Sequence, residues 1–150
     1  MSGQEPHIIA IPGDLVNSEL TGNCLFFLAS CAALAPTFYS LGNHEMKLDE
    51  RDFEKIRETG AILLNDEAIR VGEIRAAGYE RHPEPNLSWL AEFDGLPGFK
   101  LLLCHHAEYY SRYIRQTGIS ITLAGHAHGG QIRIGGRGLF APNQGVFPRW

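Results

Sequence analysis

Four short apolar runs in this chain are each followed within three residues by side chains that can bind a metal ion. Such runs are typical of strands buried in a sheet. The segment between the first two runs and the segment before the last run are predicted to form helices. In layered α/β folds, ligands collect at the carboxyl ends of the strands, so we expect these four loops to share one edge. The runs and their motifs are His7–Ile11 with Gly13-Asp14, Thr37–Leu41 with Gly42-Asn43-His44-Glu45, Lys100–Cys104 with His105-His106, and Ile119–Ala124 with Gly125-His126-Ala127-His128-Gly129-Gly130.

The segments between the runs predict helices and one group of short strands. Helices are expected over about Gly22–Ala35, after a cap at Asp49, after a cap at Asn86, and over Glu108–Thr117. The segment from Ala61 to Tyr79 contains three short strand-like pieces, separated by Asn65-Asp66 and Gly72-Glu73. Because both dipeptides suit two-residue turns, we expect an antiparallel meander there.

Composition restricts the kinds of protein this chain can be. Its 150 residues suit a single domain with its own core, and its formal net charge of −4 provides no basic field for a nucleic acid backbone. The twelve-residue apolar run at Cys24–Ala35 is too short to span a bilayer and predicts a buried helix. The three cysteines form no Cys-x-x-Cys pair, which favours reduced thiols packed in the core.

The side chains at the four strand ends favour a metal site with catalytic chemistry. Imidazole is the commonest protein ligand for transition metals, and carboxylate and amide oxygens suit hard or borderline ions. Each residue has a structural alternative, since Asp14 and Asn43 each follow a glycine and could form turns. Of His105 and His106, only one need be a ligand. A closed structural zinc site is disfavoured, because such sites prefer thiolates.

Taken in order, Gly13-Asp14, Gly42-Asn43-His44-Glu45, His105 and Gly125-His126-x-His128 resemble the motifs of the calcineurin-like metallophosphoesterases. The strings Gly125–Arg133 and Ala141–Pro148 are similar to a branch of membrane-associated bacterial phosphodiesterases. The resemblance covers nearly the whole chain. It implies an α/β fold, a layered αββα sandwich, and a metal-dependent phosphohydrolase, most plausibly a phosphodiesterase, acting on a phosphoester substrate.

The resemblance also implies a role for each matching residue. Asp14 would bridge two divalent metal ions, which could be Mn, Fe, Zn or Co. Manganese is the metal with which we expect activity to be tested first. His44 would stabilise or protonate the departing oxygen, and Glu45 would help to orient His44. Arg133 is a candidate for binding the anionic substrate. The ligands implied for the first metal are Asp14, Asn43, His105 and His126, and His128 would serve the second.

This sequence departs from the family pattern before its first matching motif. The family opens with an aspartate and a histidine two residues apart, and Met1–Gln4 contains no such pair. We therefore expect residues 1–150 to form a single but partial domain, lacking a first strand and the last strands, with one or two metals. The alternative is a degenerate, non-catalytic binding module with at most one metal. The sequence leaves two locations open, in the cytoplasm or at the membrane periphery. Membrane association would need a further N-terminal segment.

Overall fold

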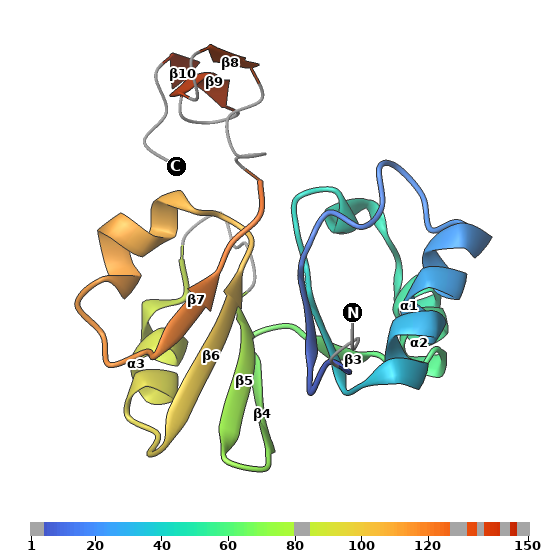
Figure 1. Cartoon of the computed structure of the whole chain (residues 1–150), viewed down its shortest axis with the longest axis horizontal. Coiled ribbons are helices and arrows are strands. Elements are labelled where there is room, and N and C mark those ends of the chain that lie inside the picture. Colours follow the sequence, from blue (N-terminus) through green and yellow to red (C-terminus); the bar gives the residue numbers. More distant parts are fainter. Residues whose placement is uncertain (1–4, 80–84, 127–131, 135–136, 142–144, 147–150) are drawn as a thin grey trace.

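The computed structural model describes residues 5–79, 85–126, 132–134, 137–141 and 145–146, without the side chains of 132–134, Arg137, Leu139 and Ala141. Two main sheets and one small sheet are formed by the described residues (Figure 1). The strands are β1 (Ile9–Pro12), β2 (Thr37–Ser40), β3 (Ile62–Leu64), β4 (Glu67–Val71), β5 (Ile74–Tyr79), β6 (Phe99–Cys104), β7 (Ile121–Leu123), β8 (Ile132–Ile134), β9 (Arg137–Ala141) and β10 (Gly145–Val146).

The strand order places the ends of β1, β2, β6 and β7 where a common site can form. The first sheet has the order β1-β2-β3 and is parallel throughout. The second has the order β4-β5-β6-β7, in which β4 is antiparallel to β5, while β5, β6 and β7 are parallel. The third sheet, β10-β9-β8, is antiparallel.

The helices begin where their capping residues predict. The three α-helices are α1 (Gly22–Leu34), α2 (Glu50–Glu58) and α3 (Leu87–Asp94). The side chain of Asp49 accepts a hydrogen bond from the Asp52 amide at 3.1 Å, and that of Asn86 accepts one from the Trp89 amide at 3.2 Å. Each bond satisfies an amide of the first helical turn that has no partner within the helix. Both predicted caps are therefore confirmed.

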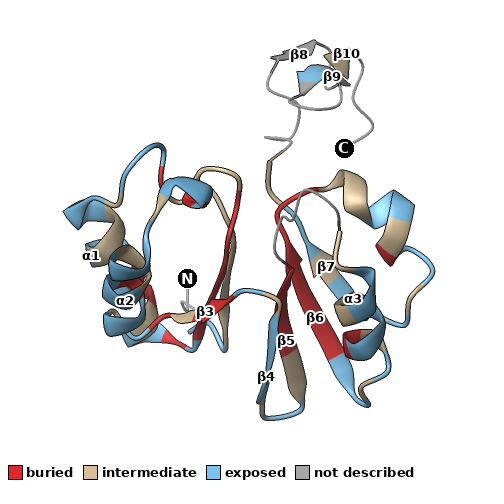
Figure 2. Cartoon of the chain, turned by 180° about the vertical axis from the view of Figure 1, so that it is seen from behind, coloured by how far each residue is buried: buried red, intermediate tan, exposed pale blue. Residues whose placement is uncertain are grey.

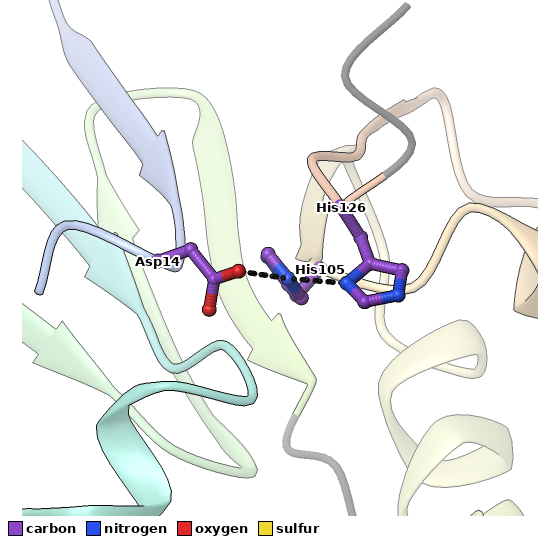
Figure 3. A group of neighbouring side chains, drawn as sticks. All are labelled: Asp14, His105 and His126. Atoms are coloured by element: carbon purple, nitrogen blue, oxygen red, sulfur yellow. Dashed lines mark hydrogen bonds and ion pairs between the residues drawn. The ribbon is translucent and has the colours of Figure 1, made fainter. Parts of the chain in front are cut away.

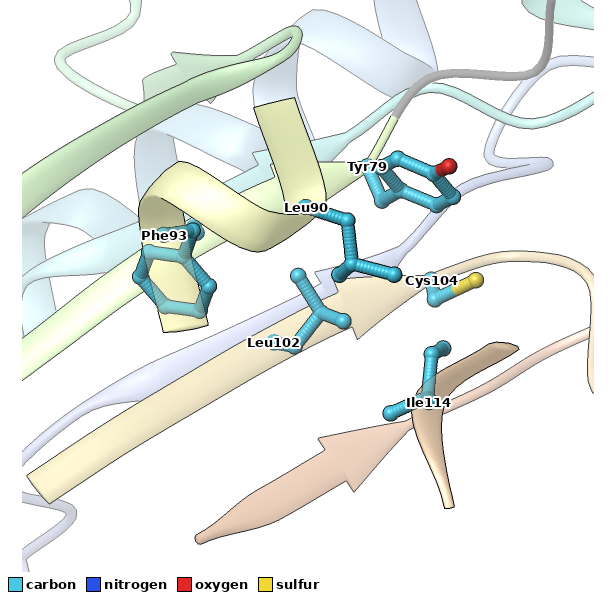
Figure 4. Close-up of a cluster of buried hydrophobic side chains, with 7 residues drawn as sticks. Tyr79, Leu90, Phe93, Leu102, Cys104 and Ile114 are labelled. Atoms are coloured by element: carbon cyan, nitrogen blue, oxygen red, sulfur yellow. The ribbon is translucent and has the colours of Figure 1, made fainter. Parts of the chain in front are cut away.

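The fold has four layers, as the αββα expectation requires. The two main sheets face each other and enclose an inner core, while α1 and α2 cover the outside of the first sheet and α3 that of the second (Figures 1 and 2). Alternation along the strands supplies both faces, so that Phe38 points to the inner core and Tyr39 to the helices. The inner core contains Phe38, Leu64, Ala76, Leu101 and Leu103. The core under α3 contains Ala77, Tyr79, Leu90, Phe93, Leu102, Cys104 and Ile114 (Figure 4).

The two main sheets approach each other closely at Gly78 on β5. A Cβ atom added to Gly78 would lie 2.4 Å from the Leu64 carbonyl oxygen and 2.7 Å from the Leu64 Cβ. We expect Gly78→Ala to lower the free energy of unfolding by about 1–3 kcal/mol in urea titrations, because the sheets must move apart. The matched control is Gly22→Ala, where an added Cβ meets no atom within 4 Å. Equal stability of the two variants would contradict this account of the sheet spacing.

One predicted element is wrong, and another is shorter than expected. The antiparallel meander over Ala61–Tyr79 does not form, because β3 joins the first sheet parallel to β2 and only β4 and β5 make a hairpin. Local turn residues cannot reveal this, since the chain at Asn65-Asp66 passes from one sheet to the other. In place of a full helix over Glu108–Thr117 there is a π-helical segment, η2 (Tyr110–Ile114), in which the Arg115 amide donates to the Tyr110 carbonyl at 2.8 Å.

The thiols agree with the sequence analysis, but the expected burial of the helix at Cys24–Ala35 is wrong, because α1 buries Leu28 and Cys31 and exposes Phe26, Phe27 and Leu34. All three cysteines are free thiols, with Cys31 and Cys104 buried and Cys24 half-buried. Burial raises the pKa of the Cys104 thiol to about 12, so it stays protonated at neutral pH. Within the described residues, no helix has the length and apolar character that a bilayer crossing requires.

Candidate metal centre

The ends of strands from both main sheets meet at one edge of the sandwich. Asp14 follows β1, His105 follows β6 and His126 follows β7, so the three residues are far apart in sequence. Each offers one ligand atom, and these atoms all lie within 4.8 Å of one another (Figure 3). The parallel pairing of β6 with β7, and the packing of β1 against β6, bring them together. The sequence-based expectation of a shared edge is therefore confirmed for these residues.

His105 lies at the centre of this group of residues, and its side chain is only 1% exposed. Its Nδ1 lies 2.7 Å from the carbonyl oxygen of Pro12, which can only accept a hydrogen bond. Nδ1 therefore carries a proton and donates it to that carbonyl. Nε2 is thus the ring nitrogen that points to the other candidate ligands. A carbonyl partner on the outer nitrogen is the usual support of a metal-binding histidine.

Nε2 of His105 faces three further candidate ligand atoms. Nε2 lies 3.1 Å from Asp14 Oδ2, 3.2 Å from Asn43 Oδ1 and 3.2 Å from His126 Nδ1. A proton on Nε2 can be donated well to one of these atoms only, whereas a metal ion can accept lone pairs from all four. Two imidazole nitrogens, a carboxylate and an amide oxygen form a donor set that suits borderline divalent ions. The residues therefore fit a divalent metal.

The backbone at two of these residues adopts the left-handed region that non-glycine residues rarely visit. Among the described non-glycine residues with positive φ, Asp14 has φ 57° and His126 has φ 58°. Such conformations carry a cost, persist only where the surroundings enforce them, and concentrate at functional sites. At Gly42, an added Cβ would lie 2.4 Å from Asp14 Oδ1, so the loops after β1 and β2 can approach this closely only with glycine there.

His44 lies beside Asp14 at the solvent-exposed side of the centre. Its backbone amide donates to Asp14 Oδ1 at 3.0 Å, and its ring Nδ1 donates to the carbonyl of Asn17. The ring Nε2 lies 3.9 Å from Asp14 Oδ2, and the side chain is 34% exposed. His44 is thus close to the centre and still accessible to a substrate.

Glu45, which begins the short 3-10 helix η1 (Glu45–Lys47), has different partners from those expected. Its carboxylate is fully buried and accepts hydrogen bonds from backbone amides after β1 and β2 and from the hydroxyl of Tyr39. None of its hydrogen bonds goes to the His44 ring. The carboxylate is turned to the backbone, so the expected role of Glu45 in orienting His44 stays a prediction.

His106 and Glu108 pair with each other, and the His106 ring packs against that of His126. Of these two residues, only His106 was considered in the sequence analysis. His106 is 4% exposed, and its Nδ1 lies 3.1 Å from Glu108 Oε1. The ring centroids of His106 and His126 are 4.7 Å apart. Burial lowers the pKa of His106 to about 4, the nearby His126 and His105 add to this effect, and Glu108 opposes it. Glu108 was missed, although its place two residues after His106 is the kind of spacing that could have revealed it.

Two of the expected site residues cannot be placed. His128 lies outside the described residues, so its part in a second metal site stays a prediction. Arg133 lies on β8, but its side chain is outside the described part of the structure. The centre that the structure does describe consists of Asp14, Asn43, His105 and His126, with His44 beside it.

Three curated bacterial proteins are similar to this chain over most of its length. The protein named Uncharacterized metallophosphoesterase YkoQ, from Bacillus subtilis, is 27% identical over 146 residues, covering 86% of this chain and 52% of that protein. Uncharacterized protein YpbG, from the same organism, is 28% identical over 145 residues, covering 87% of this chain and 54% of that protein. Phosphodiesterase YaeI of Escherichia coli is 28% identical over 150 residues, covering 87% of this chain and 52% of that protein.

These similarities confirm the resemblance to metallophosphoesterases that the motifs indicate. The chain spans about half the length of the curated relatives it matches. No protein-family model and no solved structure matches it significantly.

Proposed function

We propose that this chain carries the metal-binding part of a phosphohydrolase, most specifically a phosphodiesterase. The convergence of Asp14, Asn43 and His126 on Nε2 of His105 is the observation that carries the proposal. The names of the metallophosphoesterase and phosphodiesterase relatives support the same chemistry. Two metal ions are proposed for the complete enzyme, with Asp14 shared between them and His128 serving the second.

Different residues of this chain would have different roles in hydrolysis. When bound, divalent metal ions supply Lewis acids that polarise the phosphoester and activate water at neutral pH. Asp14 provides the negative charge that holds the cations, while the neutral Asn43 and histidine ligands keep the site positive enough to attract an anionic substrate. Arg133, one of the arginines near the end of the sequence, would bind an oxygen of the anionic phosphate.

His44 is proposed to act on the leaving group. Its Nδ1 donates to the Asn17 carbonyl, which orients the ring and leaves Nε2 close to Asp14 and accessible from solvent. In its protonated form, Nε2–H can donate a hydrogen bond or a proton to the oxygen on which negative charge develops. The role requires no contact between His44 and Glu45.

Metal-dependent turnover tests the proposed function. Protein purified without chelator and reloaded with Mn²⁺ is expected to bind at least one metal per chain and to hydrolyse bis(p-nitrophenyl) phosphate. Chelation should abolish the activity and renewed Mn²⁺ should restore it, while His126→Ala should lose it. Turnover that is independent of metal would contradict the proposal. One metal per chain without any hydrolysis would favour the non-catalytic binding module.

A further inference from the structure

Glu45 is a buried carboxylate whose hydrogen bonds all come from outside its own helical segment. Oε2 accepts from the amides of Asp14 at 2.9 Å and Gly42 at 2.7 Å. Oε1 accepts from the amides of Leu15 at 2.8 Å and Val16 at 3.2 Å. It also accepts from the Tyr39 hydroxyl at 2.6 Å. Glu45 itself is fully buried.

The amides that Glu45 binds belong to the two loops that carry the proposed ligands of the first sheet. Asp14, Leu15 and Val16 follow β1, and Gly42 immediately precedes Asn43 after β2. One carboxylate therefore joins both loops. These amides are at least partly buried, so without Glu45 they would lose a partner that water replaces poorly.

The position of the Asp14 carboxylate follows from this backbone arrangement. The Asp14 amide is held by Glu45 while its φ is 57°, a conformation that needs enforcement from its surroundings. Its Oδ1 then accepts from the His44 amide at 3.0 Å, which leaves Oδ2 facing Nε2 of His105 at 3.1 Å. Glu45 thus acts on the centre through the backbone and not through a ligand side chain.

A carboxylate is the side chain that this position requires. All five groups that bind it are donors, and an ionised carboxylate offers acceptors only. Burial, with Glu45 adding to it, raises the pKa of Tyr39, so its hydroxyl remains protonated and donates. An amide at this position would turn an NH₂ group toward backbone N–H donors.

We propose that Glu45 is a positioning residue that holds the Asp14 and Asn43 loops together and so presets the centre for metal binding. This inference rests on the proposed function, because it assigns a role at the same metal centre. It goes beyond the role of orienting His44 that the family resemblance implies for Glu45.

Two measurements on Glu45→Gln test the inference. In the metal-free protein, hydrogen exchange followed by NMR at the amides of Asp14, Leu15, Val16 and Gly42 should become at least about tenfold faster. Binding of Mn²⁺, measured by equilibrium dialysis, should weaken by about 10–100-fold, the usual effect of removing a group that supports a ligand. Phe93→Leu, in the core under α3, provides a control that lowers stability without touching either loop. It should change neither the exchange of these amides relative to their neighbours nor the affinity for Mn²⁺.

The outcomes separate this inference from the proposed function. Unchanged amide exchange and unchanged Mn²⁺ affinity in Glu45→Gln would overturn the positioning role while leaving the metal centre intact. If Glu45→Gln does not fold, the same measurements on Glu45→Asp decide, since aspartate keeps the charge but is too short to reach both loops. A wild-type protein that binds no Mn²⁺ would overturn the proposed function, and amide exchange would still decide whether Glu45 joins the loops.

Discussion

Replacing His105 by alanine is expected to weaken Mn²⁺ binding by more than about 100-fold and to reduce phosphodiester hydrolysis to the metal-free background. His105 Nε2 lies within 3.2 Å of each of three other candidate ligand atoms. The substitution also leaves the Pro12 carbonyl without its donor. Metal affinity is measured by equilibrium dialysis and hydrolysis with bis(p-nitrophenyl) phosphate.

A second histidine variant serves as the control, because it removes an imidazole that is not a proposed metal ligand. His7 is exposed and lies before β1, so His7→Ala should bind Mn²⁺ and hydrolyse substrate like the wild type. Circular dichroism of the metal-free proteins establishes that His105→Ala retains its fold. A folded His105→Ala variant with wild-type affinity for Mn²⁺ would contradict the proposed ligand set.

Removing His44 is expected to slow hydrolysis by about 10²–10⁴-fold without changing Mn²⁺ affinity. His44 hydrogen-bonds Asp14 through its backbone amide, which remains in His44→Ala, whereas its ring Nε2 lies 3.9 Å from Asp14 Oδ2, beyond hydrogen-bond distance. The loss should be largest for a phosphodiester with a poor leaving group, because such an oxygen needs a proton most. Comparing kcat for diphenyl phosphate and bis(p-nitrophenyl) phosphate at saturating Mn²⁺ measures this dependence.

Two results would argue against a leaving-group role for His44. Equal losses for both substrates would indicate that His44 acts before the leaving group departs. A parallel loss of Mn²⁺ affinity would indicate that the ring supports the metal site instead. Asn17 supplies only a backbone carbonyl to the ring, so Asn17→Ala is a control that should leave both substrates unaffected.

The parts of the fold that follow from local patterns could be predicted from the sequence. The apolar runs before Asp14, Asn43, His105 and His126 correspond to β1, β2, β6 and β7, with ends that differ by a few residues. The caps at Asp49 and Asn86 were identified because a side-chain acceptor before a helix has a local sequence signature. The convergence at the strand ends followed from a general property of parallel sheets.

Features that depend on distant partners could not be predicted in this way. The pairing of Ile62 with Phe38 places β3 in the first sheet, and no turn residue near β3 encodes it. Glu45 was expected to act on its sequence neighbour, yet its partners at Asp14, Leu15 and Val16 lie about thirty positions away. Nor does the sequence show that His105 donates to the Pro12 carbonyl, because that contact spans 93 positions.

The proposed ligands come from both halves of the sandwich, and this has a thermodynamic consequence. Asp14 and Asn43 follow strands of the first sheet, and His105 and His126 follow strands of the second, while the two sheets share no ladder of backbone hydrogen bonds. An ion held by all four residues would act as a cross-link between the sheets. By mass action, each tenfold rise in free metal above the dissociation constant would add about 1.4 kcal/mol to folding stability. The lifetime of the folded domain would then follow the supply of metal in its surroundings.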